Sequence, residues 1–172
     1  HKVIGGTITE RWGEHILTID NDIAQGNIRF INFEWGVDLL EYDITFHKDI
    51  VLVMDASSFC AMRFLYCLQG YIGHRFEIDK NLKKIEQFQS VITSNKDGGT
   101  SYAYLPKDIK LEINVIQITR RKFLKKRLND VSLLNDRLHE VFIDTDHENR
   151  FRFFGSVDLK LADKISALRN VK

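Results

Sequence analysis

The sequence has little that stiffens or crosslinks a chain. It contains one proline, Pro106, and two cysteines, Cys60 and Cys67, so it has neither a proline-rich linker nor the cysteine content of a disulfide scaffold. The two cysteines are seven residues apart in a strand-like segment, where odd spacing places them on opposite faces, too far apart to bond. We therefore expect two reduced thiols in a cytoplasmic protein.

Long hydrophobic runs are also missing. The apolar runs at 50–54 and 64–68 are soon interrupted by charged or polar residues, whereas a membrane-spanning helix needs about 20 apolar residues. We expect neither a membrane span nor a signal peptide.

The sequence has no marked excess of charge of either sign. Its 25 Lys and Arg against 24 Asp and Glu give a net charge of +1, so no overall field attracts the chain to nucleic acid or to an anionic membrane. The one strong basic cluster is 120–127, RRKFLKKR. We interpret it as a solvated helix face whose Phe123 and Leu124 pack on the rest of the protein. Any specific DNA contact is therefore expected from sequence that this chain does not contain.

The motifs of common enzyme classes are absent. There is no Gly-x-Ser-x-Gly, no phosphate-binding loop, no Gly-x-Gly-x-x-Gly and no His-x-His. The strongest chemical candidate is His47 with Asp49, because a His-x-Asp pair on a β-barrel supplies two ligands of a two-His-one-carboxylate iron site. His139 is the candidate third ligand, and Arg150 follows it at a spacing that resembles the oxoglutarate-binding end of the iron-dependent dioxygenases.

Three observations count against this iron site. Six histidines and 24 acidic residues make one His-x-acid pair an ordinary coincidence. His139 falls in a helical pattern, whereas the site needs it on a barrel strand. Arg150 lacks the hydroxyl residue expected two positions later. We therefore predict no metal, no cofactor and no catalytic residue.

The central part of the chain has the pattern of an antiparallel β-protein. Runs rich in Phe, Tyr, Ile, Val and Thr are separated by short turns, with no helix between them. Segment 83–93 fits either a helix or a strand, and we favour a strand for its second half. The expected strands are 26–35, 36–46, 49–55, 59–70, 71–79, 101–105 and 109–119.

The pattern changes after Thr119. Apolar residues then recur at helical spacing in 120–128 and in 132–142, and Thr119 and either Asp130 or Ser132 are the expected caps. A last helix is expected to begin near Val157 or Asp158. The order predicts a mainly β fold with C-terminal helices: an antiparallel barrel or sandwich at 1–119, then two or three helices at 120–172.

An apolar barrel mouth is the expected ligand site. Eight-stranded barrels leave room for one small ligand. Trp35, Phe64 and Tyr66 are the expected lining residues, and His74 is a candidate hydrogen-bonding group. Alternation leaves open which strand face is inside, and a purely structural role for His74 is the alternative. A barrel filled with side chains, in a plain interaction module, is another alternative.

The last helix carries a candidate dimer interface. Leu161, Ile165 and Leu168 recur at spacings of four and three, so they form one stripe, and Ala162 beside them permits close approach. We predict a homodimer through these four residues. The alternative is that the stripe packs on the 132–142 helix of the same chain.

Several segments resemble the N-terminal half of AraC-type transcriptional regulators. They are LYCLQG ending at Gly70, INVIQITRRKF with Arg120 and Phe123, and LADKISALRN. The resemblance implies a cupin-like barrel, or double-stranded β-helix, at 1–119 and a helical dimerisation segment at 120–172. The absence of a cap before Lys172 agrees with a chain that continues into two helix-turn-helix motifs.

The resemblance also implies a function. We expect a non-enzymatic, effector-sensing and dimerising domain of a bacterial cytoplasmic regulator, similar to the siderophore-responsive type. Its partners would be a small-molecule effector, a second copy, and DNA through a domain after residue 172. The alternative is a metal-dependent enzyme on the same cupin fold, similar to an iron(II) oxygenase, with His47 and Asp49 as ligands.

Overall fold

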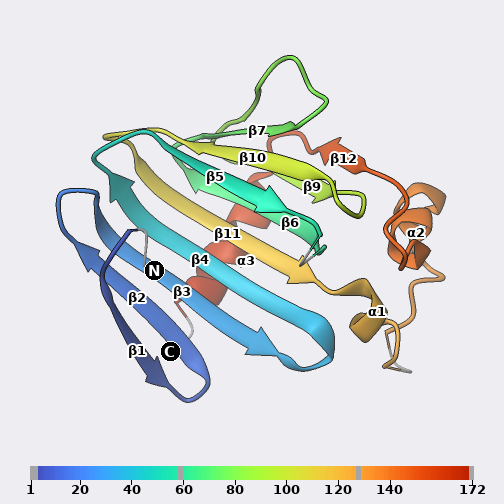
Figure 1. Cartoon of the computed structure of the whole chain (residues 1–172). Coiled ribbons are helices and arrows are strands. Elements are labelled where there is room, and N and C mark those ends of the chain that lie inside the picture. The colour runs from blue at the N-terminus through green and yellow to red at the C-terminus, as the bar shows by residue number, and fades with distance from the viewer. Residues whose placement is uncertain (1–3, 58–59, 127–128, 171–172) are drawn as a thin grey trace.

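The computed structural model describes residues 4–57, 60–126 and 129–170. They form two antiparallel β-sheets followed by helices (Figure 1). The strands are β1 (Thr7–Arg11), β2 (Glu14–Asp20), β3 (Ala24–Phe33), β4 (Val37–Phe46), β5 (Ile50–Asp55), β6 (Met62–Gln69), β7 (Ile72–Phe76), β8 (Lys83–Ile85), β9 (Ser90–Ser94), β10 (Thr100–Leu105), β11 (Lys110–Ile118) and β12 (Phe151–Phe154). The helices are η1 (Glu34–Gly36), α1 (Arg120–Phe123), α2 (Asp136–Ile143) and α3 (Leu159–Arg169). The predicted mainly β fold with C-terminal helices is confirmed.

The expected strands are all present. Each of the seven predicted runs contains one strand, from β3 to β7 and then β10 and β11. Segment 83–93 divides into β8 and β9, and its second half is a strand as predicted. The 26–35 run ends early, because Glu34–Gly36 forms the turn η1 with Trp35 at a φ of 63°. The N-terminal hairpin of β1 and β2 was not predicted.

The strand order identifies the barrel. The large sheet has the order β1-β2-β3-β4-β11-β6-β9-β12, and the small sheet has the order β5-β10-β7-β8. Strands β4 to β11 therefore form two facing four-stranded layers, 4-11-6-9 and 5-10-7-8. This arrangement is the jelly roll, or double-stranded β-helix, of which cupins are one example. The cupin-like barrel expected from the sequence is therefore present.

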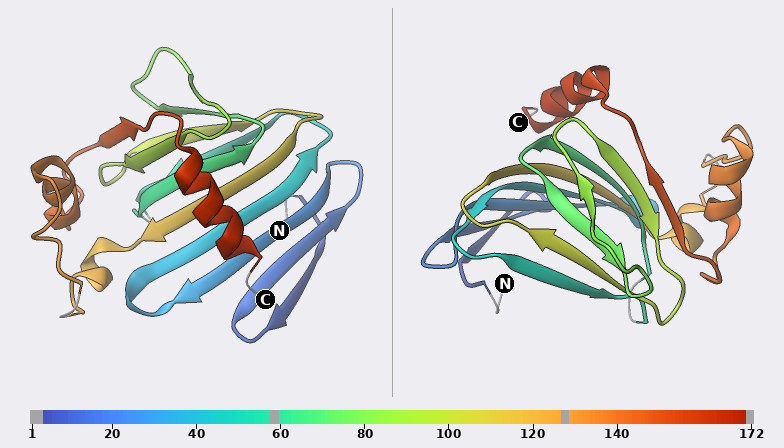
Figure 2. Two further views of the ribbon diagram at one scale, coloured as in Figure 1. Left: turned by 180° about the vertical axis from the view of Figure 1, so that it is seen from behind. Right: turned by 90° about the horizontal axis from the view of Figure 1, so that it is seen from above.

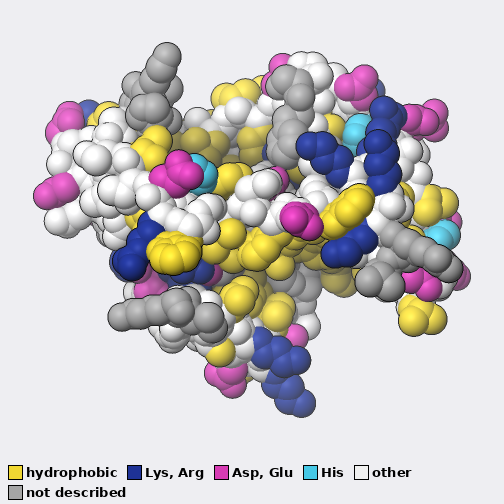
Figure 3. Space-filling model, turned by 90° about the horizontal axis from the view of Figure 1, so that it is seen from below, with side chains coloured by type: hydrophobic (Ala, Val, Ile, Leu, Met, Phe, Trp, Pro, Cys, Tyr) yellow, Lys and Arg dark blue, Asp and Glu magenta, His cyan; other side chains and the backbone are white. Residues whose placement is uncertain are grey.

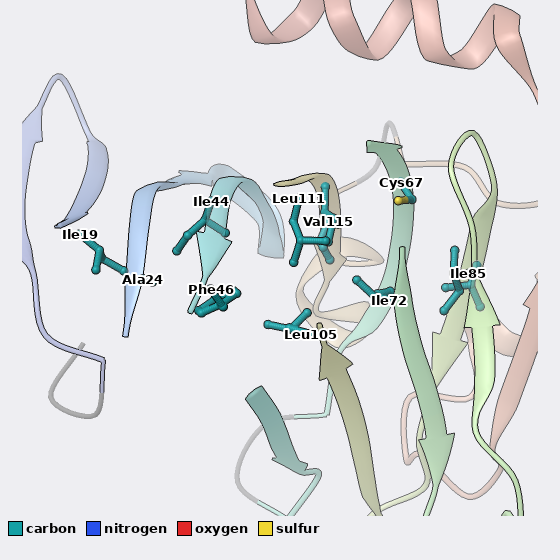
Figure 4. Packing of buried hydrophobic residues seen from close by; sticks show 12 residues of the cluster. Ile19, Ala24, Ile44, Phe46, Cys67, Ile72, Ile85, Leu105, Leu111 and Val115 are labelled. Atoms are coloured by element: carbon teal, nitrogen blue, oxygen red, sulfur yellow. The ribbon is translucent and has the colours of Figure 1, made fainter. Parts of the chain in front are cut away.

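The hydrophobic core lies between the two sheets. Side chains from the large sheet, including Ile44 and Leu111, point toward Leu105 and Ile72 of the small sheet (Figure 4). Each strand sends every second side chain into this space, because neighbouring side chains of a strand alternate between its faces.

Gly70 ends β6 with a backbone that other residues rarely adopt. Its φ is +83°, and a Cβ atom there would lie 2.6 Å from the carbonyl oxygen of Lys110. The glycine that closes LYCLQG is therefore required by the sharp turn out of the sheet.

The C-terminal segment is less helical than predicted. Helix α2 begins at Asp136, where the side chain of Asn135 accepts a hydrogen bond from Leu138 N, so Asp130 and Ser132 do not cap it. Residues 151–154 form β12, which pairs with β9 and extends the large sheet. Leu128, expected in the first of these helices, and Arg127 lie outside the described residues.

Helix α3 lies across the outer face of the large sheet, on the side away from the small sheet (Figure 2). Asp158 caps it, accepting a hydrogen bond from Leu161 N at 2.9 Å, so its start agrees with the prediction. In the described part of the chain, no helix has both the length and the apolar character needed to cross a membrane.

Candidate functional site

A cavity of about 330 Å³ lies inside the barrel, between the two sheets. Its volume is at the lower end of the roughly 300–1,000 Å³ that is typical of small-molecule sites. Most of its wall is aliphatic. The lining residues are Leu40, Tyr42, Leu52, Val53, Met54, Arg63, Leu65, Ile72, His74, Ile85, Val91, Thr93, Ala103, Leu105, Ile113, Val115 and Gln117.

Three of the polar lining residues stand side by side on the large sheet. Gln117 of β11 is the register partner of Arg63 of β6, and Arg63 is the register partner of Thr93 of β9. We call these three residues the polar row. The Nε atom of Arg63 donates a hydrogen bond to Oε1 of Gln117 at 2.9 Å, which orients the guanidinium within the row.

Arg63 has no acidic partner in the part of the chain that the structure describes. Among the described residues, no carboxylate lies within 4.0 Å of its guanidinium, and the cavity lining contains no Asp or Glu. Burial lowers the pKa of Arg63, and the Cys60 thiol and the Tyr42 phenol oppose this effect. Arginine nevertheless stays protonated in proteins. Since buried charges are normally paired, an arginine that faces a hollow without a counter-ion is unusual.

His74 lines the same cavity from the small sheet. It is 5% exposed, and its Nδ1 atom is buried without a hydrogen-bond partner among the described residues. Burial, followed by the positive charge of Arg152, lowers the pKa of His74 to about 4, and Asp79 opposes this effect. The imidazole is therefore neutral at pH 7, with one N–H to donate.

The structure does not bring the four predicted pocket residues together. His74 lines the barrel cavity. Phe64 and Tyr66 point to the outer face of the large sheet, toward α2 and α3. Trp35 is 43% exposed in η1. The prediction that Trp35, Phe64 and Tyr66 line the barrel is wrong. In β6, the residues that line the cavity are Arg63 and Leu65.

Phe64 and Tyr66 belong to a second hollow, between α3 and the large sheet. We call this hollow the α3 groove. Its volume is about 300 Å³, and its wall includes Leu161, Ile165 and Leu168 of α3. Leu65 and Val91 line both hollows. Seen from below, hydrophobic side chains gather across the centre of the molecular surface, with charged groups on either side (Figure 3).

The predicted dimer stripe packs mainly on its own chain. Ala162 is 7% exposed, and with Leu161 and Ile165 it contacts Tyr66 and Leu68 of β6. This differs from both expectations, a second copy or the 132–142 helix, because the outer face of the large sheet offers a wider apolar surface. Leu168 remains 45% exposed. Dimerisation itself stays a prediction.

Polar contacts hold α3 at both ends. At its start, the Tyr66 hydroxyl donates to the backbone oxygen of Asp158 at 2.6 Å. At its end, Arg169 donates to Oδ1 of Asn114 at 3.0 Å and to the backbone oxygen of Tyr42 at 3.2 Å.

The alternative iron ligands do not converge. His47 and Asp49 lie in the exposed turn after β4, where Asp49 accepts a hydrogen bond from Lys107 N. His139 lies on α2, as expected. The described residues contain no group of three or more His, Cys, Asp or Glu placed to hold a metal ion.

Sequence reasoning missed the polar row. Neither Arg63 nor Gln117 is among the residues that the sequence predicts for the ligand site. A signal was present, since Gln117 continues the alternating stripe of Leu111, Ile113 and Val115. A polar residue that ends an apolar stripe therefore indicated the polar end of the cavity.

Comparison with known proteins gave structural similarities only. No model of a protein family matches the chain, and no curated protein sequence is similar to it. The structure of KdgF from Halomonas sp. is 7% identical, covers 65% of this chain and 86% of its own, and superimposes with a TM-score of 0.39. The bacterial pirin YhhW from Escherichia coli, in complex with nickel(II), is 13% identical, covers 66% of this chain and 48% of its own, and has a TM-score of 0.35. We base the fold assignment on the strand order.

Proposed function

We propose that this chain is the effector-sensing domain of a bacterial AraC-type transcription regulator and that its barrel binds a small molecule. One observation carries the proposal: a largely apolar cavity of about 330 Å³ lies inside the barrel, and it is lined by the half-buried Arg63, which has no carboxylate partner among the described residues. A hollow with mostly apolar walls and a few convergent polar groups is typical of small-molecule sites. The resemblance in LYCLQG, INVIQITRRKF and LADKISALRN supports the regulatory role.

We propose binding without catalysis. General acid–base catalysis favours a group whose pKa lies near the working pH. The pKa of His74 is about 4, and burial raises the pKa of the Tyr42 phenol above its usual value. Neither group is suited to exchange a proton near pH 7, whereas both are suited to hold a ligand by hydrogen bonds.

The ligand would act through α3. A ligand shifts an equilibrium only if it prefers one of two arrangements, and Leu65 and Val91 contact both the barrel cavity and the α3 groove. These residues belong to β6 and β9, the strands that separate the two hollows, so a shift of these strands would change how α3 packs. In the proposed regulator, a separate domain after residue 172 reads DNA, and a homodimer in the cytoplasm matches paired half-sites.

The test is a thermal-shift screen of small metabolites against this chain and its Ala103→Phe variant, in which a ring fills the cavity. A ligand at 100 times its Kd stabilises by about 2.7 kcal/mol, so the melting temperature should rise by roughly 5–10 °C. Ala167→Phe, on the exposed face of α3, is the matched control. Ligands that act on the parent and on Ala167→Phe but not on Ala103→Phe support the proposal. Equal shifts in all three proteins, or none, would contradict it.

The regulatory role has its own test. Reading the gene beyond codon 172 should reveal two helix-turn-helix motifs. A stop codon, or an unrelated domain in that place, would remove the regulator from the proposal and leave a small-molecule-binding barrel.

A further inference from the structure

We infer that the ligand of the barrel carries a single carboxylate on an apolar body, and that Arg63 pairs with this carboxylate. The inference rests on the proposed function, since it assigns the chemical class of the ligand in the same cavity. It follows from the charge, the hydrogen bonding and the walls of that cavity.

The charge of the cavity calls for one negative group. Arg63 is the one Lys or Arg in the lining, and no Asp or Glu accompanies it there. Arg152, the neighbour of Thr93 on β12, already forms an ion pair with Asp79. A ligand with one negative charge therefore neutralises the cavity, whereas a second negative charge has no partner among the lining residues.

The geometry of the guanidinium favours a planar oxyanion. Gln117 accepts from Nε of Arg63, and the two terminal nitrogens of the guanidinium remain for the ligand. Two parallel N–H groups match the two oxygens of a carboxylate. Thr93 and the neutral His74 add a hydroxyl and an imidazole to the same cavity.

The remaining wall selects an apolar body. The rest of the lining is mainly apolar and includes Leu40, Leu52, Leu65, Ile72 and Ile113. Buried hydroxyl groups without partners are costly, so these walls disfavour a sugar or another polyol. Medium-chain fatty acids and arylalkanoic acids combine one carboxylate with an apolar body.

The experiment compares an acid with its uncharged analogue. Octanoate and octanamide have the same skeleton, and hydrocinnamate and hydrocinnamamide form an aromatic pair. Binding of each compound to the full chain is measured by calorimetry. We expect at least one of the acids to bind at least ten times more tightly than its amide.

Three variants locate the contact. Arg63→Met should weaken binding of that acid at least tenfold and leave its amide unchanged or tighter. Arg63→Lys keeps the charge without the paired N–H groups, and should give intermediate affinity. Arg75→Met is the matched control, because Arg75 stacks on Tyr102 and does not line the cavity. Circular dichroism checks that each variant is folded.

The outcomes separate this inference from the proposed function. An amide that binds as tightly as its acid, or acid binding that survives both Arg63 variants or Ala103→Phe, overturns the carboxylate assignment. The same follows if neither acid binds while the metabolite screen finds an uncharged ligand that Ala103→Phe excludes, and the proposed function then stands. If neither acid binds and the screen finds no cavity ligand, both fail.

Discussion

The barrel cavity and the α3 groove are hollows of similar size that share two wall residues. They differ in whether their polar side chains have partners within the chain. In the α3 groove, the side chains of Tyr66 and Asn114 each find a partner within the chain, Tyr66 at Asp158 and Asn114 at Arg169. In the barrel cavity, the guanidinium of Arg63 lacks a carboxylate among the described residues, and Nδ1 of His74 lacks any partner there. Volume does not distinguish the two hollows. The two hollows differ in whether their polar groups are paired within the chain. This difference indicates that the α3 groove holds a helix in place and that the barrel cavity binds a ligand.

The largest expected effect is at Tyr66, because it joins the sheet to α3. Tyr66→Ala should lower the free energy of unfolding by about 3–5 kcal/mol, as for other buried aromatic residues, measured by denaturant unfolding. Tyr66→Phe removes only the hydrogen bond to Asp158, and should cost about 0.5–1.5 kcal/mol. Equal losses in the two variants would mean that packing in the α3 groove does not hold the helix.

Lowering the pH should reduce the free energy of unfolding through the protonation of His74. Its pKa is about 4 in the folded protein and about 6.5 when unfolded, so the unfolded state binds the proton first as the pH falls. The contribution of His74 to the free energy of unfolding is therefore fully present above pH 6.5 and is lost as the pH falls from 6.5 to 4. The gap of about 2.5 corresponds to roughly 3 kcal/mol.

Two variants isolate this contribution. His74→Gln should flatten the fall in unfolding free energy between pH 6.5 and 4, whereas His47→Gln, on the exposed turn, should retain it. His147, whose pKa burial also lowers, keeps its own contribution in both variants. A pH profile identical in the parent and His74→Gln would contradict the assignment of a buried, neutral His74.

The contrast between the two hollows also marks the limit of sequence reasoning here. The strands were predictable because a run such as 109–119 alternates strongly and is bounded by turns. The pocket was not, because alternation along β6 is symmetrical: Phe64 and Tyr66 are as apolar as Leu65 and Cys67, and both faces are covered. Alternation therefore leaves open which face of β6 lines the cavity, and the aromatic residues Phe64 and Tyr66 lie on the outer one. Likewise, β12 is too short, and too close to polar turns, to show a strand period.

Exchange of an arginine for methionine should change the free energy of unfolding in opposite directions at the end of α3 and in the barrel cavity. Arg169→Met leaves the Asn114 and Tyr42 acceptors without their donor, and should cost about 1–2 kcal/mol. Arg63→Met removes a half-buried charge that has no counter-ion among the described residues, so the ligand-free protein should gain about 1 kcal/mol. Urea unfolding of both variants measures the difference. A loss of stability in Arg63→Met would mean that the contacts of Arg63 within the chain, including its hydrogen bond to Gln117, outweigh the cost of its missing counter-ion.

The smallest effect on stability is expected at Leu168, the exposed member of the α3 stripe. Leu161, Ala162 and Ile165 pack on the sheet, so an acidic residue at those positions should detach the helix. Leu168→Asp should instead change the free energy of unfolding by no more than about 0.5 kcal/mol, as at most surface sites.

Leu168 is also where the predicted homodimer can be tested without unfolding the chain. If two copies meet along α3, Leu168→Asp places like charges in the contact and should give a folded monomer by light scattering, with an unchanged circular dichroism spectrum. Ser166→Asp adds the same charge at another exposed position of α3 and should remain a dimer. A parent protein that is monomeric at high micromolar concentration, or a Leu168→Asp variant that still forms dimers, would contradict dimerisation through this helix. In either case α3 would only pack on the large sheet of its own chain, through contacts that include those with Tyr66 and Asn114.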